Sequence, residues 1–161
     1  MRSYRGAGYR LLYDVVRESP GDPETVVHIR EAKDVVSSFV GLQALGHVPR
    51  ERECFAALLL NAIHSTIGFH IVSIGSLNSA LVHPREVFRM AVTIGAHSIV
   101  LAHNHPSGDS TPSDQDRRIT ERLTEAGELL GIQVIDHVVI GDTSYFSFAD
   151  SRHYPIESKC N

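Results

Sequence analysis

The stretch AHNHPSGDSTPSDQD, residues 102 to 116, holds the side chains best suited to chemistry. His103 and His105 lie two positions apart, and Asp116 closes the same stretch. Two imidazoles and one carboxylate are a common ligand set of catalytic zinc, because they leave the fourth tetrahedral position open to water. Ser113 lies one helical turn before Asp116 and is placed to donate a hydrogen bond into the same space. The spacing therefore indicates a candidate zinc site.

A second interpretation of the same residues needs no metal. Ser113 and Asp116 also have the S-x-x-D spacing of a capping box, in which each side chain accepts a hydrogen bond from a backbone amide of the first helical turn. An isolated His-x-His pair is often a surface or core feature. Chance seldom produces the whole pattern H-x-H-x7-S-x2-D, so the conjunction favours the metal site.

The neighbouring elements predict how these side chains are positioned. The apolar run SIVLA before His103 predicts a short buried strand, on which His103 and His105 project to one face and Asn104 to the other. Apolar residues at helical spacing then predict a helix over 113–130, with a glycine as its stop. The first turn of that helix delivers Asp116 to the end of the strand.

The remaining pattern predicts one α/β domain without repeats or a long linker. We expect residues 1–44 to form an N-terminal extension, residues 45–150 the domain that carries the candidate site, and residues 151–161 a C-terminal tail. The further elements that we expect are an edge strand at 26–29, an amphipathic helix ending before Gly46, antiparallel strands at 54–60 and 67–76, a helix beginning at Pro84, and a hairpin of 132–140 with 144–148.

Composition limits the classes of partner and compartment. The 161 residues include 15 basic and 19 acidic side chains, and the net charge of -4 provides no general attraction to nucleic acid, although a local basic patch stays open. The N-terminus has no signal-peptide pattern and the longest apolar run is too short for a bilayer, so we expect a soluble cytoplasmic protein. Cys54 and Cys160 provide neither a disulfide framework nor a thiolate cluster. The oligomeric state stays open.

The segment HNHPSGDSTPSDQD, with HPREVFRMA upstream and DHVVIGD downstream, closely resembles the RadC-like branch of the JAMM (MPN+) metalloprotease domains. The resemblance covers roughly residues 45–150. It implies the MPN/JAMM fold, a single α/β domain with a mixed, mainly antiparallel, curved sheet flanked by helices, as in cytidine deaminases. It also implies one Zn²⁺ per chain, held by His103, His105 and Asp116.

The same resemblance implies the catalytic groups. RadC-like sequences carry the catalytic glutamate in an Arg-Glu-aliphatic-Phe segment, which reads RECF here and makes that residue Glu53. Zinc would acidify its bound water, Glu53 would take the proton and pass it to the leaving amine, and Ser113 would steady the oxyanion. The implied reaction is hydrolysis of a peptide or isopeptide bond in an unidentified peptide or protein substrate. From the residues alone, PRERECF is also typical of a solvated charge run.

Other polar residues favour structural roles. Glu86 falls in the first turn of a helix, where an acid complements the helix dipole. Asp136 and His137 are typical of a buried hydrogen-bonded brace or of support behind a ligand, and Asp109 of a turn. We assign no chemistry to four scattered histidines, His64, His70, His83 and His97.

Three classes of function follow. The first is a zinc metallopeptidase, and the second is an interaction module that binds zinc without catalysis. The third is a DNA-acting protein, either associated with repair or a nuclease. Longer RadC-like proteins have an N-terminal helix-hairpin-helix region, whereas only about forty residues precede this module, which weakens the DNA interpretation. The string HNH does not indicate a nuclease, and the H-x-E and P-C-x-x-C elements of zinc deaminases are absent from the sequence.

Overall fold

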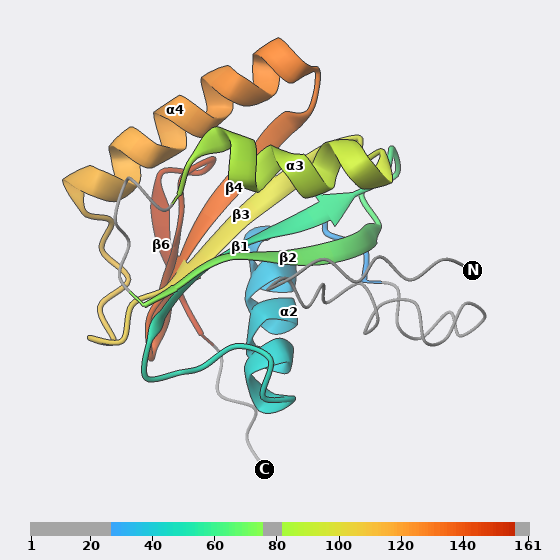
Figure 1. The fold of residues 1–161 in the computed structure, drawn as a ribbon. Coiled ribbons are helices and arrows are strands. Elements are labelled where there is room, and N and C mark those ends of the chain that lie inside the picture. Colours follow the sequence, from blue (N-terminus) through green and yellow to red (C-terminus); the bar gives the residue numbers. More distant parts are fainter. Residues whose placement is uncertain (1–26, 76–81, 157–161) are drawn as a thin grey trace.

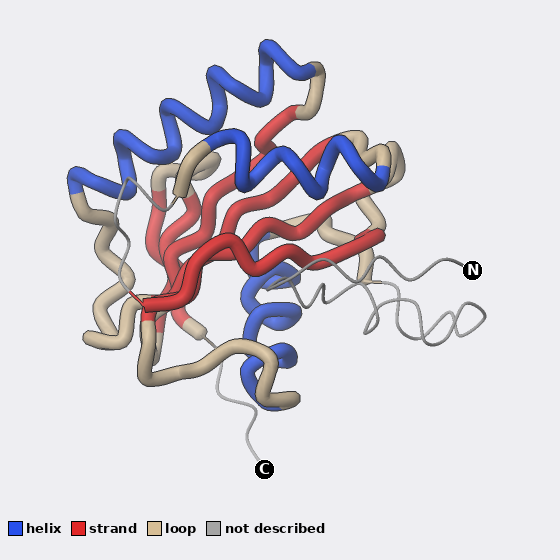
Figure 2. The backbone as a smooth tube through the Cα atoms, in the orientation of Figure 1, coloured by secondary structure: helices blue, strands red, loops and turns tan. Residues whose placement is uncertain are grey.

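The computed structural model describes residues 27–75 and 82–156. These residues form three helices and six strands arranged around one sheet (Figures 1 and 2). In chain order the elements are α2 (Ala32–Ala44), β1 (Glu53–Leu60), β2 (Thr66–Gly75), α3 (Pro84–Ile94), β3 (Ser98–Asn104), α4 (Asp114–Leu130), β4 (Gln133–Ile140), β5 (Ser144–Ser147) and β6 (Arg152–Pro155).

The six strands lie in the order β2-β1-β3-β4-β5-β6. Only the pair β3 and β4 is parallel, and helix α4 provides the crossover between them. The other neighbouring strands are antiparallel. The predicted mixed, mainly antiparallel sheet is therefore confirmed.

Helices cover both faces of the sheet, with α2 on one face and α3 and α4 on the other (Figure 1). Strand β1 explains the arrangement, because seven of its eight residues are buried. Cys54, Ala56 and Leu58 belong to the core that α2 covers. Phe55 and Ala57 belong to the core beneath α3 and α4. Strand β1 is thus apolar at both its odd and its even positions because helices cover both faces of the sheet.

Helices α3 and α4 begin where the sequence predicts, and α4 also ends there. Pro84 is the first residue of α3, where its missing N–H costs no hydrogen bond. Ser113 caps α4. Both helices end at a glycine in the left-handed region, Gly95 with φ 69° and Gly131 with φ 68°, a conformation that glycine adopts without steric cost. In the described part of the chain, no helix combines the length and apolar character needed to cross a bilayer.

The margins of the sheet differ from the prediction at two places. The described part of the predicted edge strand at 26–29 makes only an isolated antiparallel bridge, His28 with Ser65. Conversely, β6 lies in the segment predicted to be a tail, where it pairs with β5 and Tyr154 stacks on Tyr145 with ring centroids 5.3 Å apart. A four-residue strand is too short to give a periodic signal, and long-range pairing decides whether it forms. Cys160 lies outside the described residues.

Candidate metal centre

The candidate site lies at the edge of the sheet where β3 ends and where β1 and α4 begin (Figure 1). His103 pairs across the sheet with Phe55 of β1, and the two rings stack with centroids 5.8 Å apart. Glu53 precedes Phe55 by two residues, so its side chain leaves the same face of the sheet. His105 follows the strand, and its backbone N–H donates to the carbonyl oxygen of Ile140 on β4, 2.9 Å away.

The three predicted ligands converge at this edge. Nε2 of His103 lies 3.0 Å from Nε2 of His105. The Asp116 carboxylate places Oδ1 3.3 Å from the first of these nitrogens and Oδ2 3.5 Å from the second. Atoms bound to a tetrahedral zinc ion at about 2.0–2.1 Å lie about 3.4 Å from one another. The chemistry and spacing of this donor set therefore fit zinc.

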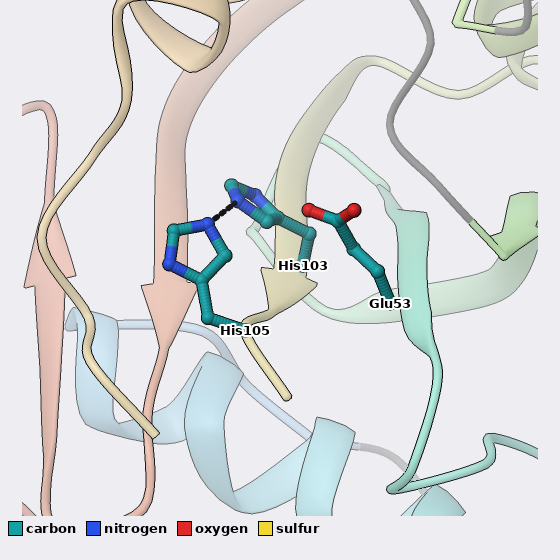
Figure 3. A group of neighbouring side chains, drawn as sticks. All are labelled: Glu53, His103 and His105. Atoms are coloured by element: carbon teal, nitrogen blue, oxygen red, sulfur yellow. Dashed lines mark hydrogen bonds between the residues drawn. The ribbon is translucent and has the colours of Figure 1, made fainter. Parts of the chain in front are cut away.

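Glu53 joins the two histidines from the opposite strand. Figure 3 shows its carboxylate pointing toward the His103 ring. One oxygen of Glu53 and one nitrogen of each histidine all lie within 4.8 Å of one another, so the Glu53 carboxylate is within reach of an ion held by the two histidines. The segment RECF is therefore not a solvated charge run at this position, since Glu53 is partly buried beside the histidines.

Asp116 takes part in both interpretations offered by the sequence. Its Oδ2 accepts hydrogen bonds from the backbone N–H of Ser113 at 2.7 Å and from the Ser113 hydroxyl at 2.6 Å, so the capping box is present. Burial raises the pKa of Asp116, but the hydrogen bonds from His105 and Ser113 and the nearby His103 outweigh it and hold the pKa well below its usual range. Asp116 is therefore a carboxylate at neutral pH, as a metal ligand must be.

The two histidines differ in their electrostatic surroundings. Complete burial, and then the neighbouring His137, lower the pKa of His103 well below 6.5, which keeps this imidazole neutral. The hydrogen bond to Asp116 raises the pKa of His105, and its Nδ1 donates to the carbonyl oxygen of Asp109 at 2.7 Å. Since a ligating histidine must offer a lone pair, His105 would release a proton from Nε2 when a metal binds.

Asp136 and His137 form the brace that the sequence predicts. The Asp136 carboxylate accepts hydrogen bonds from the backbone N–H of His137 at 2.7 Å, from the Ser147 hydroxyl at 2.7 Å and from the Ala149 N–H at 2.9 Å. Nε2 of His137 lies 2.8 Å from Nδ1 of His103. His137 therefore lies behind a candidate ligand, on the side away from the other donors.

Asn104 is a residue whose role the sequence does not reveal. It points to the opposite face from the histidines, as the strand pattern predicts, where its Oδ1 accepts a hydrogen bond from the backbone N–H of Cys54 at 3.0 Å. Its Nδ2 donates to the carbonyl oxygens of Arg52 at 3.1 Å and Arg50 at 3.3 Å. These contacts hold the backbone on both sides of Glu53. The one feature of the sequence that could have pointed to this role is an amide side chain between two histidines at the end of a buried strand.

The loop between His105 and Asp116 is held against β4 and β5. The Asp109 carboxylate accepts from the backbone N–H of Thr111 at 2.9 Å, which forms the predicted turn. Gly108 has φ 83°, and its carbonyl oxygen accepts from the N–H of Asp142 at 3.0 Å. A Cβ at Gly141 would overlap that same carbonyl oxygen, so glycine is required for this approach. The loop is thereby positioned to offer the Asp109 carbonyl to His105.

The remaining candidates lie outside this cluster. Glu86 forms ion pairs with Arg85 at 3.3 Å and Arg89 at 3.5 Å on the exposed side of α3. His83 caps that helix, and His70 contacts the backbone carbonyl of Glu86 at 3.1 Å. His64 lies in the turn between β1 and β2 with φ 57°, and His97 lies between α3 and β3, where its backbone N–H donates to the carbonyl oxygen of Leu60.

A model of the RadC-like JAB domain matches residues 27–153, most of the chain. The chain belongs to the RadC-like JAB domain family. Three bacterial relatives carry the name UPF0758 protein. That of Alkaliphilus metalliredigens is 53% identical over 62% of the chain, that of Desulforamulus reducens 48% over 77%, and that of Staphylococcus carnosus 40% over 83%.

This RadC-like JAB domain spans about half the length of the curated relatives it matches, between 43% and 57% of the three. The names of these relatives state no reaction or ligand. The family accounts for the six-stranded mixed sheet with helices on both faces.

Proposed function

We propose that this RadC-like JAB domain is a zinc-dependent metallopeptidase that hydrolyses a peptide or isopeptide bond. One observation carries the proposal. Two imidazole nitrogens and a carboxylate lie 3.0–3.5 Å apart, as zinc requires, and a second carboxylate, that of Glu53, approaches from the opposite strand. A purely structural zinc site has four protein ligands and no need of a nearby base.

Each ligand has a group that orients it. His103 and His105 would bind zinc through Nε2, since the Nδ1 atom of each ring is engaged elsewhere. Asp116 would bind through Oδ1, because Ser113 holds Oδ2 with two hydrogen bonds. When bound, zinc acidifies a water molecule and polarises the carbonyl group of the scissile bond.

Glu53 is the proposed general base. Its carboxylate approaches the two histidines from β1. Glu53 would accept the proton released by the attacking water and deliver it to the leaving nitrogen. Asn104 keeps this carboxylate in place by fixing the backbone of residues 50–54.

Ser113 has one hydroxyl proton and two proposed uses for it. In the structure the hydroxyl donates to Oδ2 of Asp116 and its oxygen accepts from the Asp116 N–H at 3.2 Å. For Ser113 to stabilise the oxyanion, its hydroxyl must turn from Asp116 toward the substrate. We propose that the Ser113 hydroxyl first orients Asp116 and then donates to the oxyanion during turnover.

The substrate proposed for this site is a peptide or protein whose scissile bond reaches the sheet edge. A site that binds zinc without catalysis is the alternative outcome, because it would use the same three ligands. The presence of Glu53 favours the enzyme. The net charge of -4 gives no support to a nucleic-acid ligand.

Zinc content and hydrolysis test the proposal separately. The protein is purified without a chelator or histidine tag and assayed on internally quenched peptide libraries and on matching substrates linked through a lysine side chain. Glu53→Gln should keep the fold and the zinc and lose hydrolysis roughly a hundredfold or more.

Glu86→Gln is the matched control and should hydrolyse like the wild type, since Glu86 pairs with arginines. Equal hydrolysis by both variants contradicts the peptidase proposal and leaves a non-catalytic zinc site. Loss of hydrolysis in Glu86→Gln alone places the base on α3.

A further inference from the structure

A chain of three hydrogen bonds leads from α4 to Nδ1 of His103, the ring nitrogen that faces away from the other candidate ligands. Oγ1 of Thr120 lies 2.6 Å from the carbonyl oxygen of Asp116 and 2.6 Å from Nδ1 of His137. Nε2 of His137 lies 2.8 Å from Nδ1 of His103. Both imidazoles are 0% exposed, so these groups satisfy one another rather than water.

The direction of every hydrogen bond follows from the first member, because a carbonyl oxygen only accepts. The Thr120 hydroxyl therefore donates its single proton to Asp116. Its oxygen then accepts from Nδ1 of His137, which must carry a proton. The opposite order would leave two acceptors facing each other across 2.6 Å between Thr120 and Asp116.

The same reasoning fixes the proton on His103. A buried neutral imidazole has one N–H, so Nε2 of His137 is an acceptor once Nδ1 is the donor. The nitrogen facing it, Nδ1 of His103, must then donate. Nε2 of His103 is left with a lone pair, and it is this atom that faces His105 and Asp116.

We propose that Thr120 and His137 are positioning residues that hold His103 in the tautomer protonated at Nδ1, ready to bind a metal through Nε2. The purpose of this arrangement rests on the proposed zinc site. Asp116 thus contributes twice, once with its side chain as a ligand and once with its carbonyl group as the acceptor that orders the chain. The partner of a ligating histidine sets which nitrogen binds the metal.

The second histidine is also oriented through its Nδ1 atom, by a shorter route. Nδ1 of His105 donates directly to the carbonyl oxygen of Asp109 at 2.7 Å. His103 sits deeper, where β4 lies beside β3 and where His137 provides the acceptor. The Nδ1 atoms of both histidines are therefore donors, and both Nε2 atoms face the space between the two rings.

The tautomer can be measured on the metal-free protein. Long-range ¹H–¹⁵N spectra of histidine-labelled protein near neutral pH should show His103 protonated at Nδ1 in the wild type. Thr120→Ser should retain this tautomer, whereas Thr120→Val should lose its predominance. Thr124→Val is the matched control, because Thr124 makes the same hydroxyl contact one turn later, to the carbonyl oxygen of Thr120 at 2.9 Å. A wild-type His103 protonated at Nε2 overturns the inference.

Zinc affinity, measured by competition with a chromophoric chelator, is the second readout. Thr120→Val should bind zinc about tenfold more weakly, at the lower end of the range for removing support behind a ligand. Thr120→Ser and Thr124→Val should match the wild type. Unchanged affinity in Thr120→Val overturns the inference, and equal weakening in Thr124→Val does so as well, because it assigns the effect to the helix.

The two proposals fail in different ways. A protein that hydrolyses no substrate but shows His103 protonated at Nδ1 keeps this inference and loses the peptidase proposal. A protein that hydrolyses peptides while its metal-free His103 carries the proton on Nε2 keeps the peptidase proposal and loses this inference.

Discussion

Helices α3 and α4 cover the same face of the sheet, and each carries an acid three residues after its capping residue. In α3 these residues are His83 and Glu86, and in α4 they are Ser113 and Asp116. By local sequence alone both acids complement a helix dipole. In the structure the Glu86 side chain is 36% exposed, whereas that of Asp116 is 2% exposed.

The difference comes from what lies opposite each helix terminus. Glu86 contacts Arg85 and Arg89 of its own helix, so its surroundings are local. Asp116 contacts His103 and His105, which arrive from a strand end in the middle of the sheet. A helix start therefore becomes a candidate ligand only when the topology places a second set of donors against it.

The largest expected effect is on the zinc content of the protein when one of these two acids is replaced. Asp116→Ala should remove stoichiometric zinc, because a site reduced from three protein ligands to two binds too weakly to survive dialysis. His103→Ala should do the same. Elemental analysis of dialysed protein, with circular dichroism to verify folding, measures the effect.

Glu86→Ala is the control for this comparison and should keep wild-type zinc. Full zinc retention in both Asp116→Ala and His103→Ala would remove the metal site from this sheet edge. Zinc loss in Glu86→Ala would show that the two helix termini are not distinct in the way that the contacts indicate.

The pH dependence of stability sharpens the comparison next. Burial lowers the pKa of His137, beside α4, from 6.5 to about 4. Below pH 6.5 the unfolded chain therefore binds a proton that the folded protein does not, so stability falls as the pH falls from about 6.5 to 4. The difference between the two pKa values lowers the free energy of unfolding by about 3 kcal/mol at most. Urea unfolding of the metal-free protein across this range measures it.

His137→Gln should reduce this dependence without abolishing it, since glutamine has no proton to gain whereas His103 keeps its lowered pKa. His70, beside α3, is the counterpart, because burial lowers its pKa as well, against a hydrogen bond that its ring donates to the Glu86 carbonyl oxygen and that raises the pKa. We expect His70→Gln to flatten the dependence less than His137→Gln. A wild type whose stability does not change between pH 6.5 and 4 contradicts the buried neutral state of His137.

The cluster of candidate ligands could be predicted because its spacing combines two periodicities. A two-residue step on a strand puts His103 and His105 together, and a helix start delivers Asp116. Glu53 needed the family resemblance, since a charge run before a strand looks the same whether its last acid is solvated or turned inward. The structure places it there because β1 begins antiparallel to the end of β3.

The supporting residues could not be predicted, for a different physical reason. Thr120 sits one turn after Asp116 and His137 lies on another strand, so their contact with each other depends on how α4 packs against β4. Asn104 had a predictable direction but no predictable partner, because its acceptors and donors are backbone groups of residues 50–54. Strand β6 likewise formed where pairing with β5, and not its own sequence, decided the outcome.

The smallest expected effect compares the two capping residues. Ser113→Ala removes the oxygen that accepts from the Asp116 N–H and the proton that Oδ2 of Asp116 accepts, so the free energy of unfolding should fall by about 1 kcal/mol. Hydrolysis should fall too, by about tenfold or more, if the same hydroxyl serves the oxyanion.

His83→Ala should cost about 1 kcal/mol or less and leave hydrolysis unchanged, because His83 caps α3 with a 3.2 Å contact to Arg85. Ser113→Thr, which keeps the hydroxyl, should recover most of both losses. Stability lost in Ser113→Ala with turnover unchanged would make the two helix starts alike in function as well as in sequence, with capping as the whole role of Ser113.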